Sequence, residues 1–264
     1  MPVRRIGDGN IGKGATMNIA VVFAGGVGKR MKTGGLPKQF LEVNGKPILV
    51  HTLSLFQEHE EIDAIVLVMV ADWIGYSQEL IAEYDLNKVV TVEPGGETGQ
   101  DSIYHGLMAA RRYARSQEGE GAEYRTVVLL HDGVRPMINA DLISANIAGV
   151  KENGSAITCV PCNETVVMVD DDGDRVVRTV ERSHARIAKA PQSFWLADII
   201  HAHERALQLG EHDIIDSCTM MQHFGAVTPS VVLCGYENIK VTTPEDYYTL
   251  KMFLDMRDGK LKEV

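Results

Sequence analysis

Short apolar runs recur along the chain, and segments with helical spacing separate them. Four runs have the length and the valine and isoleucine content of buried strands: residues 18–23, 62–71, 89–92 and 125–130. The intervening segments predict helices over residues 47–59, from a cap at Asp72 to about Tyr84, from Thr98 to about Arg115, and from Asn139 or Asp141 onward. This alternation predicts an α/β fold with a mostly parallel sheet and helices on both faces.

The pattern changes between Cys162 and about Ala188, where valine and threonine alternate with polar residues around an acidic turn, Asp170 to Asp174. Alternation with a period of two predicts an antiparallel hairpin. An exposed hairpin edge needs cover, so we expect residues 162–188 to form an arm that pairs in a homodimer. After the arm, Thr243-Pro-Glu-Asp246 predicts the start of a closing helix that reaches about Arg257.

Composition narrows the possible functions. The chain has 26 basic and 36 acidic residues, a net charge of −10, and 45% hydrophobic residues, which excludes extensive disorder. The acidic balance argues against binding to duplex nucleic acid, and no apolar run reaches the roughly 18 to 20 residues of a membrane span. Four cysteines are too few for a disulfide scaffold, which favours the cytoplasm. Residues 1–16 lack a signal-peptide core, so we expect a flexible extension before a single domain over 17–264.

A glycine-rich loop, Ala24-Gly-Gly-Val-Gly-Lys-Arg-Met31, follows the first predicted strand. It matches neither a Walker loop nor a dinucleotide fingerprint, which disfavours an NAD-dependent oxidoreductase. Its glycines let backbone N–H groups approach an anion closely, and Lys29 and Arg30 add cationic donors, so the loop is suited to holding phosphates. A plain strand-to-helix turn is the alternative interpretation. The next cation along the chain is Lys38.

A second polar loop, His131-Asp-Gly-Val-Arg-Pro136, directly follows the strand predicted over residues 125–130. Asp132 at this place can hold Mg²⁺ through one oxygen while substrate phosphates and water complete the octahedron. Alternatively, Asp132 makes the turn and pairs with Arg135. Both loops fall at the carboxyl ends of strands, where α/β sheets bind their ligands. Together they predict chemistry at phosphorus, which needs positioning and charge neutralisation more than a covalent intermediate.

Eight short motifs occur in the order seen in the sugar-alcohol-phosphate cytidylyltransferases, and the resemblance covers about Met17 to Arg257. They are Phe23 to Met31, Pro37 to Phe40, Gly95-Gly96 with Asp101-Ser102, His131 to Pro136, Glu164-Thr165, Glu181-Arg182, Pro191 to Phe194 and Asn238 to Thr242. The resemblance implies a Rossmann-like fold with a protruding dimerisation arm, CTP as a substrate, Mg²⁺ as cofactor and a sugar-alcohol phosphate as acceptor.

The resemblance also implies roles for individual residues. Arg30 and Lys38 would be catalytic, stabilising charge on the triphosphate in the transition state, and Asp132 would hold Mg²⁺. Arg135, Thr165, Arg182 and Lys240 would bind the acceptor, with Arg182 supplied by the arm of a partner subunit. The CTP site would contain Phe23, Ala24, Gly25, Gly26, Gly28, Lys29, Gly96, Glu97 and Ser102.

Two positions depart from the family pattern. Gly99 stands where an arginine is usual, and Ala190 stands where a threonine is usual. The loop and helix motifs look closer to the branch that uses D-ribitol 5-phosphate than to the branch of isoprenoid synthesis that uses 2-C-methyl-D-erythritol 4-phosphate. We therefore expect ribitol 5-phosphate as acceptor, with methylerythritol phosphate as the alternative. The alternative from a different functional class is a protein that binds the nucleotide but does not catalyse the transfer.

Overall fold

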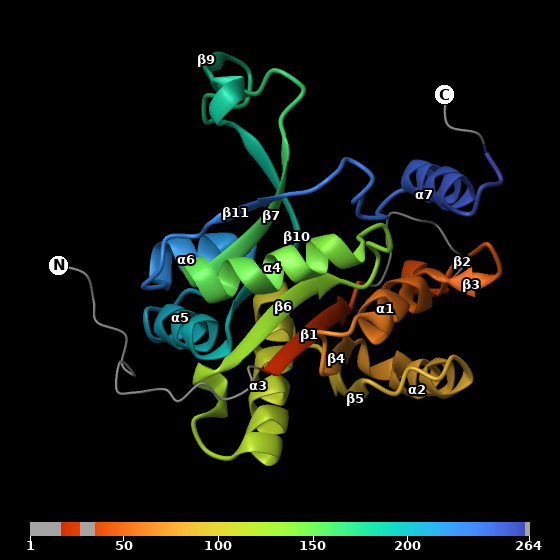
Figure 1. Cartoon of the computed structure of the whole chain (residues 1–264). Coiled ribbons are helices and arrows are strands. Elements are labelled where there is room, and N and C mark those ends of the chain that lie inside the picture. The colour runs from red at the N-terminus through yellow and green to blue at the C-terminus, as the bar shows by residue number, and fades with distance from the viewer. Residues whose placement is uncertain (1–16, 27–34, 262–264) are drawn as a thin grey trace.

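The computed structural model describes residues 17–26 and 35–261, which form an α/β fold around one seven-stranded sheet (Figure 1). The strand order is β11-β7-β10-β6-β1-β4-β5. The bounds are β1 Met17–Ala24, β4 Ala64–Met69, β5 Val89–Pro94, β6 Thr126–Asp132, β7 Ser155–Pro161, β10 Arg186–Trp195 and β11 Val231–Leu233. Only β10 runs antiparallel to its neighbours in this sheet, so the predicted mostly parallel sheet is confirmed.

Seven α-helices lie in the described residues: α1 Ile48–Glu58, α2 Ile74–Glu83, α3 Gly99–Glu118, α4 Ala140–Asn153, α5 Leu196–Gln208, α6 Ser217–Phe224 and α7 Pro244–Arg257. Thr98 and Thr243 each begin a helix with a reciprocal capping box, and Asn139 caps α4, as the sequence predicts. The predicted cap at Asp72 is wrong, because this residue lies in a short 3₁₀ turn and α2 begins only after Trp73. None of these helices is long and apolar enough to cross a bilayer.

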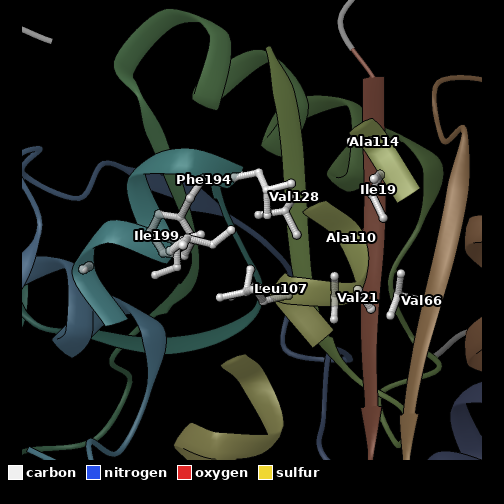
Figure 2. Packing of buried hydrophobic residues seen from close by; sticks show 14 of the residues in the cluster. Ile19, Val21, Val66, Leu107, Ala110, Ala114, Val128, Phe194 and Ile199 are labelled. Atoms are coloured by element: carbon white, nitrogen blue, oxygen red, sulfur yellow. The ribbon is translucent and has the colours of Figure 1, made fainter. Parts of the chain in front are cut away.

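Alternate residues of the central strands pack on opposite faces of the sheet. Ile19 and Val21 of β1 face α3, α5 and α6, where Leu107 and Phe194 complete one apolar layer (Figure 2). Ala20 and Val22 face the other layer, to which α1 and α4 contribute. Because both faces are covered, the strands are apolar at nearly every position, which explains why continuous runs rather than alternation marked them in the sequence.

The predicted hairpin is present and protrudes from the sheet at the top of Figure 1. Its strands are β8, Val167–Val169, and β9, Val176–Thr179, and a short 3₁₀ turn, Arg182–His184, leads back into β10. The side chains of this hairpin are exposed, including Val176 and Val177 at 62% and 68%. An apolar hairpin with this exposure is suited to pairing with another surface, and its role in a dimer stays a prediction.

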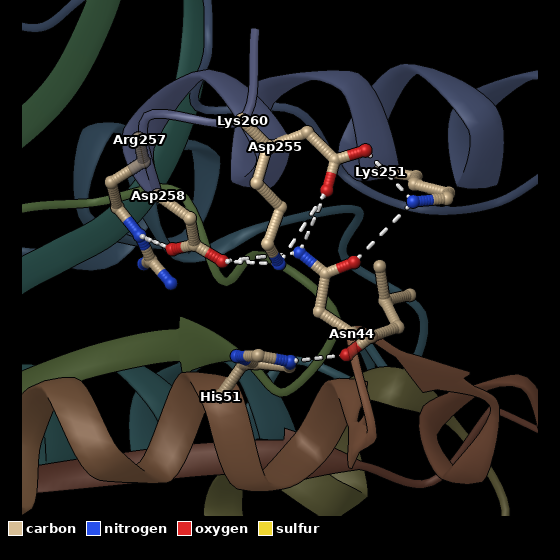
Figure 3. Close-up of polar contacts among 8 residues, drawn as sticks. Asn44, His51, Lys251, Asp255, Arg257, Asp258 and Lys260 are labelled. Atoms are coloured by element: carbon tan, nitrogen blue, oxygen red, sulfur yellow. Dashed lines mark hydrogen bonds and ion pairs between the residues drawn. The ribbon is translucent and has the colours of Figure 1, made fainter.

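Helix α7 holds the small hairpin of β2, Glu42–Val43, and β3, Lys46–Pro47 (Figure 3). Asn44 at the turn has a positive φ of 52° and donates its amide to Asp255 at 3.0 Å and Asp258 at 3.2 Å. His51 of α1 lies 2.8 Å from the carbonyl of Val43. These contacts anchor the hairpin directly after the turn that carries Lys38, Lys38–Phe40.

Candidate functional site

A cavity of about 200 Å³ opens where the carboxyl ends of β1 and β6 meet the middle of β10. Phe23 and Asp132 are partners at the ends of the two parallel strands, and both line the cavity. The amide of Gly133 donates to the carbonyl of Phe23 at 2.8 Å, which closes the turn after β6. A Cβ on Gly133 would lie 3.1 Å from the Cβ of Ala24 and 3.2 Å from the Phe23 carbonyl oxygen, so a side chain here would require the neighbouring atoms to shift.

Asp132 lies between two cations. Lys240 Nζ lies 2.7 Å from Oδ1, and Arg135 Nε donates to Oδ2 at 2.7 Å. Burial favours the neutral acid, but the two cations outweigh it and lower the pKa of Asp132 from 3.8 to about 2. The carboxylate is therefore ionised at neutral pH. Asp132 thus forms the ion pair with Arg135 that the sequence predicted as an alternative to Mg²⁺ binding.

His131 has a structural place in the same turn. Its side chain is buried, and Nε2 lies 3.0 Å from the carbonyl oxygen of Arg135. Burial lowers the pKa of His131 to about 4, so the imidazole is neutral at pH 7. A neutral, hydrogen-bonded ring fixes the shape of the turn and is not suited to proton transfer near neutral pH.

Arg135 connects the cavity to the segment around Asn238. Its Nη1 donates to the carbonyl of Asn238 at 3.2 Å, and the amide of Asn238 donates to the carbonyl of Ala190 at 2.7 Å. Asn238 is buried and begins the motif Asn238 to Thr242, but no role for its side chain was predicted from the sequence. The structure shows that it joins the β6 turn to β10.

The base of the glycine loop lies beside Lys38. Gln39 donates its amide to the carbonyl of Ala24 at 2.6 Å, and a Cβ added to Gly26 would lie 3.7 Å from Cε of Lys38. Gly25 and Gly26 are exposed, whereas Lys38 is only 9% exposed. Lys38 thus lies beside the described start of the loop, and its role at the triphosphate stays a prediction. Arg30, Gly28 and Lys29 lie outside the described residues.

The predicted nucleotide segment after β5 forms the start of α3. The amide of Gly96 donates to Oγ of Ser102 at 3.1 Å, and Ser102 donates to the carbonyl of Thr98 at 3.0 Å. Glu97 is exposed. Ile103, one residue further, lines the cavity, so this helix start lies at its edge. Backbone N–H groups at a helix N-terminus favour anions, which fits a phosphate-bearing ligand.

Thr165 and Arg182 lie on the arm and do not line the cavity of their own chain. Both side chains are exposed, and Nη1 of Arg182 donates to the carbonyl of Asn163 at 3.4 Å. The structure thus brings Phe23, Asp132, Arg135 and Lys240 together but leaves these two residues apart. Their place at an acceptor site depends on the arm of a second subunit, which stays a prediction.

The donor set fits a magnesium ion that binds together with a nucleotide. Within the described residues, no group of three or more His, Cys, Asp or Glu side chains is arranged to bind a metal ion. Asp132 is a single ionised carboxylate, partly exposed at the cavity, and Mg²⁺ is commonly held by one or two carboxylates plus substrate phosphates. Both Asp132 oxygens are paired with cations, so Mg²⁺ would compete with Lys240, whose side chain is 44% exposed.

Comparison with known proteins finds cytidylyltransferases by family model and by sequence. The model of the 2-C-methyl-D-erythritol 4-phosphate cytidylyltransferase family, IspD, matches residues 18–256. A ribitol-5-phosphate cytidylyltransferase of Streptococcus agalactiae serotype III (strain NEM316) is 50% identical over 244 residues, 92% of this chain and 98% of that protein. A 2-C-methyl-D-erythritol 4-phosphate cytidylyltransferase of Clostridium botulinum (strain 657 / Type Ba4) is 38% identical over 231 residues, 87% of this chain and 93% of that protein.

A solved structure is also similar over nearly the whole chain. The 4-diphosphocytidyl-2C-methyl-D-erythritol synthase of Anaerococcus prevotii DSM 20548 superposes with a TM-score of 0.74 and 27% identity, covering 91% of this chain and 96% of that one. The likeness therefore extends from sequence to three-dimensional arrangement.

Proposed function

We propose that this chain, which belongs to the 2-C-methyl-D-erythritol 4-phosphate cytidylyltransferase family, transfers CMP from CTP to D-ribitol 5-phosphate and releases pyrophosphate. The product would be CDP-ribitol. Sequence identity supports this choice of acceptor. The chain is 50% identical to a relative named for ribitol 5-phosphate and 38% identical to one named for methylerythritol phosphate. The cationic cavity at the carboxyl edge of the sheet supports the reaction class, because both substrates carry phosphate.

The reaction is an in-line attack by a phosphate oxygen of the acceptor on the α-phosphorus of CTP. The new P–O bond forms as the bond to the β-phosphate oxygen breaks, and pyrophosphate leaves with that electron pair. The attacking phosphate is already ionised at neutral pH, so the step needs no general base. His131 fits this picture, because its ring is neutral and already hydrogen-bonded. The task of the protein is to position two anions and to neutralise their charge.

Individual side chains supply these functions. Lys38, beside the glycine loop, and Arg30 neutralise charge that develops on the triphosphate. Arg135 and Lys240 hold the acceptor phosphate at the cavity. Thr165 and Arg182 reach the acceptor from the partner subunit, which requires a homodimer joined through the arm. The exposed valines of the hairpin support that arrangement.

Asp132 would hold Mg²⁺ when CTP binds. The ion would supply positive charge that stabilises the triphosphate as pyrophosphate departs. Asp132 is suited to this role because its low pKa keeps the carboxylate ionised. The exposed side chain of Lys240 permits this residue to contact the acceptor phosphate.

The product serves the synthesis of a wall or capsule polymer such as a teichoic acid, and the enzyme works in the cytoplasm. All four cysteines, Cys159, Cys162, Cys218 and Cys234, are free thiols, which supports a reducing compartment.

The test is pyrophosphate release from CTP and Mg²⁺ with ribitol 5-phosphate and, in parallel, with 2-C-methylerythritol 4-phosphate. We expect release with ribitol 5-phosphate at a kcat/KM well above that with the other acceptor. Preference for methylerythritol phosphate would assign the chain to isoprenoid synthesis, the alternative that the family model favours. Binding of CTP without release from either acceptor would identify a nucleotide-binding protein without turnover.

A further inference from the structure

Lys189 is a further cation of the cavity, and no role for it was predicted from the sequence. Its side chain is half-buried and lines the cavity together with Arg135, Lys240 and Asp132. Within the described residues, its ammonium group has no carboxylate within ion-pair distance and no hydrogen-bond acceptor. A half-buried ammonium group without a counter-ion is costly, so its place in a cavity points to an anionic ligand.

The two carboxylates of the cavity are already engaged by other groups. Asp132 pairs with Arg135 and Lys240. Asp216 accepts the amide of Gln192 at 3.1 Å on one oxygen and the backbone N–H of Thr219 at 2.8 Å on the other. The cavity is lined by three cations, Arg135, Lys189 and Lys240, but by only these two carboxylates, so its net charge is positive. This excess charge favours a ligand that carries phosphate.

The position of Lys189 comes from an irregularity in β10. Pairing of β10 with β7 shifts between Ala188 and Gln192: these residues are four apart, but their partners Cys159 and Ile157 are two apart. Extra residues in one strand bend it and re-aim its side chains, commonly beside active sites. The irregularity therefore presents Lys189 at the cavity.

The backbone on both sides of Lys189 is anchored. Ala188 pairs with Cys159 in the sheet, and the carbonyl of Ala190 accepts the amide of Asn238 at 2.7 Å. The carbonyl of Asn238 in turn accepts from Arg135 at 3.2 Å. An anchored backbone leaves only the lysine side chain to be ordered when a ligand binds, which lowers the entropic cost of the contact. Burial and the nearby Arg135 lower the pKa of Lys189, as expected for an ammonium group that lacks an anion.

We propose that Lys189 binds the phosphate group of the acceptor and thereby contributes to acceptor affinity. The inference rests on the proposed function, because it takes the acceptor to be a sugar-alcohol phosphate. The acceptor phosphate is favoured over the triphosphate of CTP, because Lys189 is close to Arg135, a residue of the acceptor side, whereas Lys38 and the glycine loop lie beside the first strand.

The test compares Lys189→Gln with Lys189→Arg, and uses Lys151→Gln on the exposed face of α4 as a charge-matched control. For Lys189→Gln we expect the KM for ribitol 5-phosphate to rise about 10-fold to 100-fold, as for a lost hydrogen bond to a charged group. We expect kcat to change less than about three-fold, since the contact exists before the chemical step. Lys189→Arg should restore most of the affinity, and Lys151→Gln should behave as the unmodified protein does.

Calorimetric titration with inorganic phosphate and with ribitol 5-phosphate provides a readout that does not need turnover. Weaker binding of both by Lys189→Gln, with an unchanged melting temperature, is the expected result. An unchanged acceptor KM, or a rise in the KM for CTP alone, would overturn the inference. If the unmodified protein fails to release pyrophosphate but its phosphate binding depends on Lys189, the proposed function is wrong while the anion site stands.

Discussion

Lys240 and Asp132 form an ion pair of 2.7 Å at the cavity, although Asp132 ends β6 and Lys240 lies just before α7. The pair holds an exposed lysine over the place where two anionic substrates would meet. It also keeps Asp132 ionised, together with Arg135. Lys240 thus pairs with Asp132 in the free site, and in the proposed reaction it would bind the acceptor phosphate when the substrates enter.

Replacement of Lys240 tests its role at the acceptor. Lys240→Ala should lower kcat/KM for the acceptor about 10-fold to 100-fold, because one charge-assisted contact to phosphate contributes roughly 1.5 to 3 kcal/mol. Steady-state pyrophosphate release measures the effect. The matched control is Lys251→Ala, which removes a surface pair with Asp255 on α7 and should leave turnover unchanged. Equal losses in the two variants would contradict a local role for Lys240.

His203 should make the folded state sensitive to mild acid. It is buried and stacked on Tyr104, with neither ring nitrogen hydrogen-bonded within the described residues. Burial lowers its pKa from 6.5 to about 4, so the folded state binds this proton less readily than the unfolded chain. The neutral ring therefore favours folding fully above about pH 6.5, and this contribution is lost as the pH falls toward 4, by about 3 kcal/mol at most.

His203→Phe keeps the aromatic contact and removes the titration. We expect the variant to be at least as stable as the parent at pH 7, because the two unpaired ring nitrogens are replaced by carbon. Urea unfolding between pH 7 and 4.5 should give a flatter dependence for the variant, with the remaining slope due to groups such as His131. Parallel curves for the two proteins would show that His203 is not the titrating group.

Gly106 should be intolerant of even a methyl group. A Cβ there would lie 2.5 Å from Cγ1 of Val21 and 2.8 Å from Cγ2 of Val68, because α3 packs closely on β1 and β4. Gly106→Ala should cost roughly 1 to 3 kcal/mol in the free energy of unfolding, more than the helix propensity gained. Gly75→Ala in α2 is the control, since nothing lies within 4 Å of its added Cβ, and it should be neutral or stabilising. Denaturant unfolding that ranks the two variants the other way would contradict the close packing.

A mixing experiment tests whether the arm completes the site of a partner. Arg182→Ala and Lys240→Ala should each be poorly active alone. In a dimer of one chain of each kind, one site combines an intact Lys240 with an intact Arg182, so statistical exchange should restore about a quarter of the parent activity. Light scattering checks that dimers form. Absence of recovery after exchange would place Arg182 outside the partner's site.

Prediction from the sequence succeeded where short-range patterns decide structure. Thr98 and Thr243 begin their helices as predicted, because capping depends on residues three positions apart. The alternation over residues 162–188 predicted the hairpin. By contrast, β10 was not predicted as a strand next to the central β6. Pro191 lies inside it, and proline usually argues against a central strand.

The sequence by itself determined the order of the main strands and helices from β1 to α4, the two polar loops after β1 and β6, and the residue types suited to phosphate chemistry. Only the tertiary structure decided which of these residues meet. The pairing of Asp132 with Lys240, the place of Lys189 at the cavity and the separation of Arg182 from the cavity of its own chain all depend on long-range packing. Periodicity and capping are local properties of the chain, whereas these contacts depend on how distant segments pack, including the antiparallel course of β10 between β6 and β7.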